Sequence, residues 1–132
     1  MRFDPTEYRV TNAETGGAKG QKSARFDLIP AGPLRSLAEH YGHSCDKYED
    51  RNWEKGYAWS LSFAALNRHL WAFWAGEDID HESEHGAHHL DAVMFHVMAL
   101  RQFAEQDRYA ALDDRPLESA HRPPEWQGAA DL

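Results

Sequence analysis

Residues 58–75 read AWSLSFAALNRHLWAFWA, and this stretch decides the fold. Its apolar residues recur every three or four positions, a spacing that is typical of an α-helix. Apolar side chains also fill the other faces of that helix, which therefore must be buried nearly all round. Gly76 follows the stretch and predicts the end of the helix. The apolar residues are Trp59, Leu61, Phe63, Ala64, Leu66, Leu70, Trp71, Phe73 and Trp74.

Two amphipathic patterns flank this helix. One predicted helix begins after Gly32, with Pro33 in its first turn, and a second covers residues 87–109. Two amphipathic helices cannot fully cover a third that is apolar on every side, so a second subunit should complete the bundle. We therefore predict an all-α helical bundle that is completed by oligomerisation, as a homo-oligomeric dimer or tetramer.

The ends of the chain differ from this helical domain, which we place at residues 33–109. Residues 1–32 contain several glycines and only short apolar stretches, which predicts an extended N-terminal arm. Residues 110–132 contain three prolines among polar residues, which predicts a tail. Between the arm and the tail, no alternating run is bounded by an Asn-Gly or Asp-Gly turn, so no strand pair is expected there.

Composition restricts the function further. The 132 residues include 14 Lys and Arg against 22 Asp and Glu, a net charge of -8 that repels nucleic acids and anionic membranes. A phosphate-bearing ligand would have to arrive with cations. No apolar run is long enough to span a membrane, and the start of the chain lacks a secretion signal pattern. Cys45 is the single cysteine, which fits a reducing cytoplasm. Together these features predict a cytoplasmic protein without nucleic-acid or membrane partners.

One pattern with metal-ligating side chains, Glu-x3-His-x2-Asp, occurs twice. Offsets of four and three place three side chains on one face of a helix. If the two helices pack together, four carboxylates and two imidazoles converge, and the like charges of the carboxylates repel one another. Bound divalent cations usually neutralise such repulsion. Carboxylate oxygens suit Mg²⁺, whereas imidazoles shift the preference toward Mn²⁺ or a later metal. Solvated helix faces are the alternative. The predicted metal ligands are Glu39, His43, Asp46, Glu84, His88 and Asp91.

Other histidines have their own alternatives. His69 lies inside the apolar helix and is expected to be a hydrogen-bonded core residue. His85, His89 and His96 share a neighbouring stripe, and His89 becomes a ligand if the helix is rotated by one residue. Glu82 and His85 form one ExxH unit, but the second unit of a di-iron bundle is missing.

Several residues are candidates for nucleotide binding. The segment 16–23 resembles a P-loop, but Gln21 stands where the second glycine is needed, so this interpretation fails. The cations could still bind phosphates. Trp53 could stack on a base while Asn52 reads its edge, or Trp53 could seal its loop onto the apolar helix. The substrate-binding candidates are Lys22, Arg25, Lys47, Asn52, Trp53 and Arg68.

Several separated motifs resemble the phage dATP/dGTP diphosphohydrolase family. They are KSARFDLIP at 22–30, KY at 47–48, RNWEKG at 51–56, NRHL at 67–70, GEDID at 76–80 and HL at 89–90. That family is similar to the all-α MazG-type nucleoside triphosphate pyrophosphohydrolases, which convert dNTP to dNMP and pyrophosphate with Mg²⁺ or Mn²⁺. Among named enzymes, the family resembles the MazZ-type dGTP pyrophosphohydrolase of phages with 2-aminoadenine DNA, where the dGMP made in this way is the precursor.

The resemblance implies metal-assisted attack of water on the α-phosphorus, with two or more Mg²⁺ or Mn²⁺ ions. Glu39 and Asp91 are the first choices as ligands, and Asp46 or Glu84 as the acceptor of the water proton. MazG enzymes hold metals on an ExxE and an ExxD helix, but Gly42 stands where the second Glu of the first motif would fall. The expected substrate is a purine dNTP, with dGTP favoured and dATP as the other candidate, in the host cytoplasm if the gene is phage-borne.

A competing interpretation has no catalysis. In it, the chain is a helical oligomer that binds a transition metal through histidine and carboxylate, as a sensor or store. Tight binding of Zn²⁺, Ni²⁺ or Cu²⁺ without nucleotide turnover would distinguish it from the enzyme.

Overall fold

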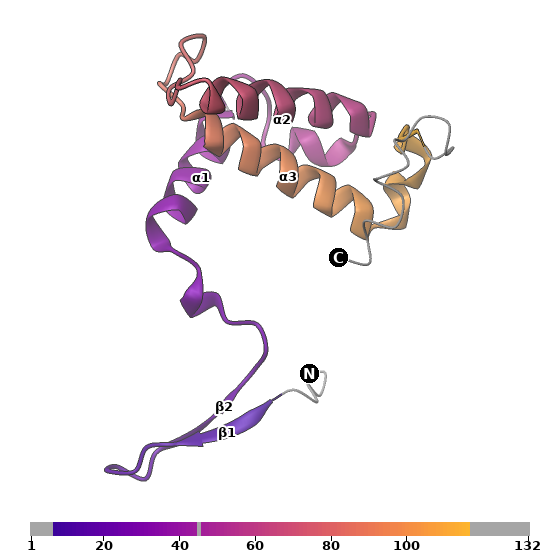
Figure 1. Ribbon diagram of the computed structural model, residues 1–132. Coiled ribbons are helices and arrows are strands. Elements are labelled where there is room, and N and C mark those ends of the chain that lie inside the picture. Colours follow the sequence, from indigo (N-terminus) through magenta and orange to yellow (C-terminus); the bar gives the residue numbers. More distant parts are fainter. Residues whose placement is uncertain (1–6, 45, 117–132) are drawn as a thin grey trace, which may run out of the picture. The chain divides into compact units, whose positions relative to one another are not determined.

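The computed structural model describes residues 7–44 and 46–116, and the predicted tail beyond 116 lies outside this part of the chain. The chain divides into two compact units, one up to Leu34 and one from Arg35 onward, and each is described by itself. Three α-helices dominate: α1 (Ala31–Ser44), α2 (Trp59–Trp74) and α3 (His89–Glu105) (Figure 1). Short 3-10 helices are η1 (Phe26–Leu28), η2 (Asn52–Lys55) and η3 (Asp107–Leu112). The predicted all-α class is confirmed.

The first unit contains the one departure from that class among the described residues. Strands β1 (Tyr8–Thr11) and β2 (Ala18–Gln21) pair antiparallel, with Tyr8 opposite Gln21. The sequence predicted an extended arm for this segment and did not identify the hairpin within it. The turn contains neither Asn-Gly nor Asp-Gly. Instead the Asn12 Oδ1 accepts the N–H groups of Glu14 and Thr15 at 2.9 Å, and Gly16 supplies a φ of 76°.

Helices α2 and α3 run side by side in the second unit and carry its core (Figure 1). Trp59 of α2 packs with Ala99 and Phe103 of α3 and with Tyr109 of η3. The Tyr109 hydroxyl donates to the backbone carbonyl of Glu54 at 2.5 Å, which fixes η3 onto η2. The segment that follows α3, predicted in part as tail, therefore completes the core up to Leu112.

Helix α1 contacts the first half of α3 through residues 36–41. The Ser36 hydroxyl donates a hydrogen bond to Asp91, and the rings of His40 and Tyr41 pack on Phe95, with centroids 5.6 Å and 4.9 Å apart. These contacts bring together the two helices whose packing was the condition for the repeated pattern to converge.

One side of α2 is not covered by the second unit itself. Trp59 and Ser62 are buried, but Leu61, Phe63, Trp71 and Trp74 are exposed by 60, 62, 68 and 79%. Within the described part of the second unit, α2 is therefore not buried nearly all round as predicted. None of the helices in the described ranges has the length and apolar character needed to cross a membrane.

Candidate functional site

The loop between α2 and α3 is closed on itself by backbone hydrogen bonds. Gly76, with a φ of 101°, ends α2 in a conformation that side chains other than glycine rarely adopt. The Asp80 N–H then donates to the carbonyl of Ala87, and the His89 N–H donates to that of Asp78, both at 2.8 Å. The two ends of the loop therefore lie together, with His89 at the start of α3.

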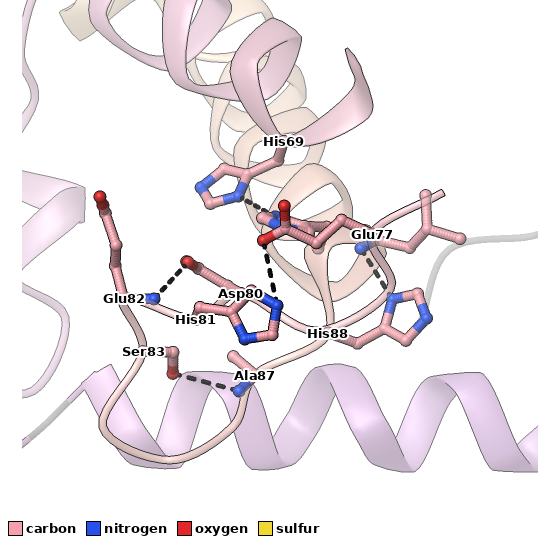
Figure 2. Close-up of polar contacts among 10 residues, drawn as sticks. His69, Glu77, Asp80, His81, Glu82, Ser83, Ala87 and His88 are labelled. Atoms are coloured by element: carbon pink, nitrogen blue, oxygen red, sulfur yellow. Dashed lines mark hydrogen bonds and ion pairs between the residues drawn. The ribbon is translucent and has the colours of Figure 1, made fainter. Parts of the chain in front are cut away.

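Short polar side chains order the interior of this loop (Figure 2). The Asp80 Oδ1 accepts the N–H of Glu82 at 2.9 Å, and the Ser83 hydroxyl oxygen accepts the N–H of Ala87 at 3.1 Å. Such local bonds satisfy backbone groups that have no helical partner. They also hold the Asp80 carboxylate near the base of the loop.

Three side chains of this region form what we call the inner group: His69, Asp80 and His89. One potential ligand atom from each lies within 4.8 Å of the others. The His69 and His89 Nδ1 atoms are 2.9 Å apart and share a hydrogen bond, and His89 Nε2 lies 3.1 Å from Glu77 Oε1. His89 is only 5% exposed. It is therefore fixed between α2 and the carboxylate that follows α2.

The electrostatics of this region favour a neutral His69 imidazole and an ionised Glu77 carboxylate. Burial lowers the pKa of His69, an effect that the charge of Asp80 partly opposes. The hydrogen bond from His89 lowers the pKa of the Glu77 carboxyl. Neutral imidazole and ionised carboxylate are the protonation states that bind metal ions. Two imidazoles and a carboxylate are a fitting donor set for a divalent cation.

Further titratable groups surround the inner group. Asp91, 9% exposed, accepts a hydrogen bond from the Ser36 hydroxyl. Burial lowers the pKa of His40, although the Asp91 charge opposes this shift. Burial also lowers the pKa of His96 to about 4, and His69 and His40 add to that shift. These histidines are thus kept neutral at physiological pH.

The six predicted ligands are not brought to one face. Helix α3 begins at His89, so Glu84 lies in the preceding turn and His88 caps the helix, its Nδ1 accepting the N–H of Leu90 at 3.0 Å. Helical spacing therefore does not apply to this copy of the pattern. Glu39 is exposed and pairs with Arg35, with 3.3 Å between Oε1 and Nε. Asp91 lies in the first turn of α3, two residues after His89 of the inner group.

His43 and Asp46 meet a different partner, and with it they form what we call the outer group: His43, Asp46 and His85. Their potential ligand atoms also lie within 4.8 Å of one another. His85 Nε2 is 2.9 Å from Asp46 Oδ2, and the rings of His43 and His85 stack at 4.2 Å. All three residues are exposed.

The candidate substrate-binding residues are spread over both units. In the first unit, Lys22 pairs with Glu7 at 3.9 Å and Arg25 with Asp27 at 2.7 Å. In the second unit, Lys47 Nζ lies 5.5 Å from the centroid of the neighbouring Tyr48 ring. Arg68 is exposed on α2, and its charge contributes to the lowered pKa of His69.

Asn52 and Trp53 begin η2, and both are partly buried. The indole of Trp53 packs against the rings of Phe95 and Phe103, with centroids 6.3 and 6.1 Å apart. The structure thus favours the second of the two sequence-based alternatives, in which this indole seals its loop, although the helix it covers is α3.

Periodicity did not identify His69, Glu77 or Asp80 as ligands, and it gave His89 only as an alternative. The spacing of 20 residues between the two histidines of the inner group carries no helical signal. The motifs NRHL, GEDID and HL contained the signal, because these three segments supply all four residues.

Comparison with known proteins agrees with those motifs. A family model described as dATP/dGTP diphosphohydrolase, N-terminal, matches residues 13–115. No curated protein and no solved structure gives a significant match. Since the family model covers most of the chain, including the whole inner group, the chain belongs to the dATP/dGTP diphosphohydrolase family and is a nucleoside triphosphate pyrophosphohydrolase.

Proposed function

We propose that this enzyme hydrolyses a purine dNTP, preferably dGTP, to dNMP and pyrophosphate at the inner group, with the help of divalent cations. The observation that carries this proposal is the convergence of His69, Asp80 and His89. In a phage, the dGMP so formed would supply the synthesis of 2-aminoadenine nucleotides.

The donor set indicates which cation fits. Mg²⁺ prefers oxygen ligands, whereas imidazole favours Mn²⁺ and later metals. His69, Asp80 and His89 therefore fit Mn²⁺ better than Mg²⁺. A bound divalent cation would supply positive charge to the phosphoryl oxygens and lower the pKa of water.

The chain's own residues orient this group and bind the substrate. Glu77 holds His89 in place through the Nε2 hydrogen bond, which fixes the ring orientation. Arg68, the residue before His69, provides a cation for the triphosphate, which an acidic chain otherwise repels. Asp91 was predicted as a metal ligand, and we assign it a different role here: it lies in the first turn of α3, two residues after His89, and would accept the proton from the attacking water.

Metal removal tests the proposal. In EDTA, hydrolysis of dGTP should stop, because the acidic chain cannot bind the triphosphate without added positive charge. Replacing EDTA by Mn²⁺ should restore turnover, and Mg²⁺ should restore it less well. Full turnover in EDTA would contradict the proposal. Binding of Zn²⁺ or Ni²⁺ with no turnover under any metal would favour the non-catalytic metal-binding oligomer instead.

We also propose that the exposed side of α2 is covered by a second copy of the chain. Trp71 and Trp74, exposed by 68 and 79%, present large apolar surfaces of the kind that mark subunit contacts. Sedimentation at micromolar concentration should show an oligomer. Trp74→Glu should shift it toward the monomer, whereas Glu105→Gln, at the exposed end of α3, should not. A wild-type monomer would contradict this proposal.

A further inference from the structure

We propose that the outer group of His43, Asp46 and His85 is a second metal site. It would bind a later first-row divalent cation such as Zn²⁺, Co²⁺ or Ni²⁺, and it would fasten the α2–α3 loop to the end of α1. This inference does not rest on the proposed function, because the outer and inner groups share no residue.

The three side chains come from three separate segments. His43 lies in the last turn of α1, Asp46 lies in the turn that follows, and His85 lies in the α2–α3 loop. His85 is 39 residues from Asp46 in the sequence, yet its Nε2 lies 2.9 Å from the Asp46 carboxylate. The loop is therefore already directed onto α1 at this point.

The two imidazoles lie face to face beside the carboxylate. Their rings stack with centroids 4.2 Å apart and planes inclined by only 11°. A neutral imidazole presents one nitrogen lone pair that can bind a metal ion. With one potential ligand atom from each residue within 4.8 Å of the others, a single ion can lie among all three.

The ligand types define the class of cation. Two nitrogen donors and one carboxylate oxygen, with a fourth position left for water, suit Zn²⁺, Co²⁺ or Ni²⁺ far better than Mg²⁺. The side chains of His85 and Asp46 are exposed by 36 and 64%, so an ion can enter from solvent. The inner group, by contrast, includes the buried His89.

An ion held here would act on the loop that supplies the inner group. The loop segment from Asp80 to Ala87 is closed by the backbone hydrogen bond between these two residues and by the Ser83 side chain. Because His85 lies within this segment, fixing it to His43 and Asp46 would reduce the opening motions of the whole segment. Asp80, at the base of the loop, would be held more firmly as a result.

Cobalt titration of the metal-free protein tests this proposal directly. Co²⁺ gives visible absorption bands when it is bound by imidazole and carboxylate in a four-coordinate site. Wild-type protein should bind one equivalent at the outer group in addition to that at the inner group. His85→Asn should lose one equivalent, whereas the matched variant His81→Asn, with an 82% exposed side chain on the same loop, should retain both.

Two more variants make the outcome unambiguous. Asp80→Asn should lose the equivalent of the inner group and keep the one that His85→Asn removes, so failure at one group is distinguishable from failure at the other. Cys45→Ser, next to Asp46 in the sequence, should bind as the wild type. Unchanged Co²⁺ binding in His85→Asn would overturn the proposal, and so would loss of the outer equivalent in Cys45→Ser, because a thiolate would then be the ligand.

Amide hydrogen exchange provides a readout that does not depend on spectra. Saturating Zn²⁺ should slow exchange across residues 80–87 in the Asp80→Asn protein, in which the inner group is disabled. The double variant Asp80→Asn/His85→Asn should show no such slowing. Equal protection in both proteins would overturn the proposed connection between loop and helix.

Discussion

Replacing Asp80 by asparagine should reduce the turnover of dGTP by roughly 100-fold or more. Loss of a residue that only supports a metal ligand already reduces activity by about 10- to 100-fold. Asparagine keeps the shape of the side chain, and its amide oxygen can still accept the N–H of Glu82. The loop should therefore stay closed while the inner group loses its negative charge. Steady-state kinetics with Mn²⁺ measures the effect.

Asp78→Asn is the matched control for this variant. Asp78 is an exposed aspartate two residues earlier in the same loop, and the contact it makes with His89 is through its backbone carbonyl. Its replacement changes the net charge by the same amount and should leave turnover near the wild-type rate. A similar loss in both variants would assign the effect to the charge of the loop rather than to the inner group.

The second large effect is a loss of stability in mild acid. His96 has a folded pKa of about 4 against 6.5 for an ordinary histidine, because burial disfavours the charged ring. The unfolded chain thus binds the extra proton between these pH values. The stability contributed by neutral His96 is complete above pH 6.5 and is lost as pH falls toward 4. At about 1.36 kcal/mol per unit, the loss is roughly 3 kcal/mol.

Urea unfolding of the metal-free protein at several pH values measures this loss. His96→Asn cannot titrate, and its side chain can still hydrogen-bond to the Ser62 hydroxyl, which lies 2.9 Å from His96 Nδ1. Its unfolding free energy should vary less between pH 6.5 and 4. The exposed His81→Asn should behave as the wild type. If the unfolding free energy of His96→Asn changed with pH as steeply as that of the wild type, His96 would not be the source of the acid-induced loss of stability.

The helices were predictable because their signals are local. The apolar spacing of residues 58–75 and Gly76 predicted a helix within one residue of α2 at each end. The hairpin was missed because its turn depends on the Asn12 side chain and the φ of Gly16 rather than on a two-residue turn motif. Such a turn has no strong local signal in a segment with few β-branched residues.

The candidate site was less predictable, because it is built by a loop. Repeated offsets of four and three indicate one face only if every residue is helical, and α3 begins after Glu84 and His88. Asp46 likewise follows the end of α1, where its partner is His85. Periodicity cannot reveal contacts that a closed loop creates, whereas the family-like motifs included His69, Asp80 and His89 without indicating their geometry.

Identification of the first products of dGTP hydrolysis tests the central claim most directly. Attack at the α-phosphorus releases dGMP and pyrophosphate, whereas attack at the γ-phosphorus gives dGDP and phosphate. With Mn²⁺, ion-exchange chromatography should show dGMP, together with pyrophosphate that becomes phosphate only after pyrophosphatase is added. The appearance of dGDP, or of deoxyguanosine with triphosphate, as the first product would contradict the proposed reaction even if the inner group were shown to bind the metal.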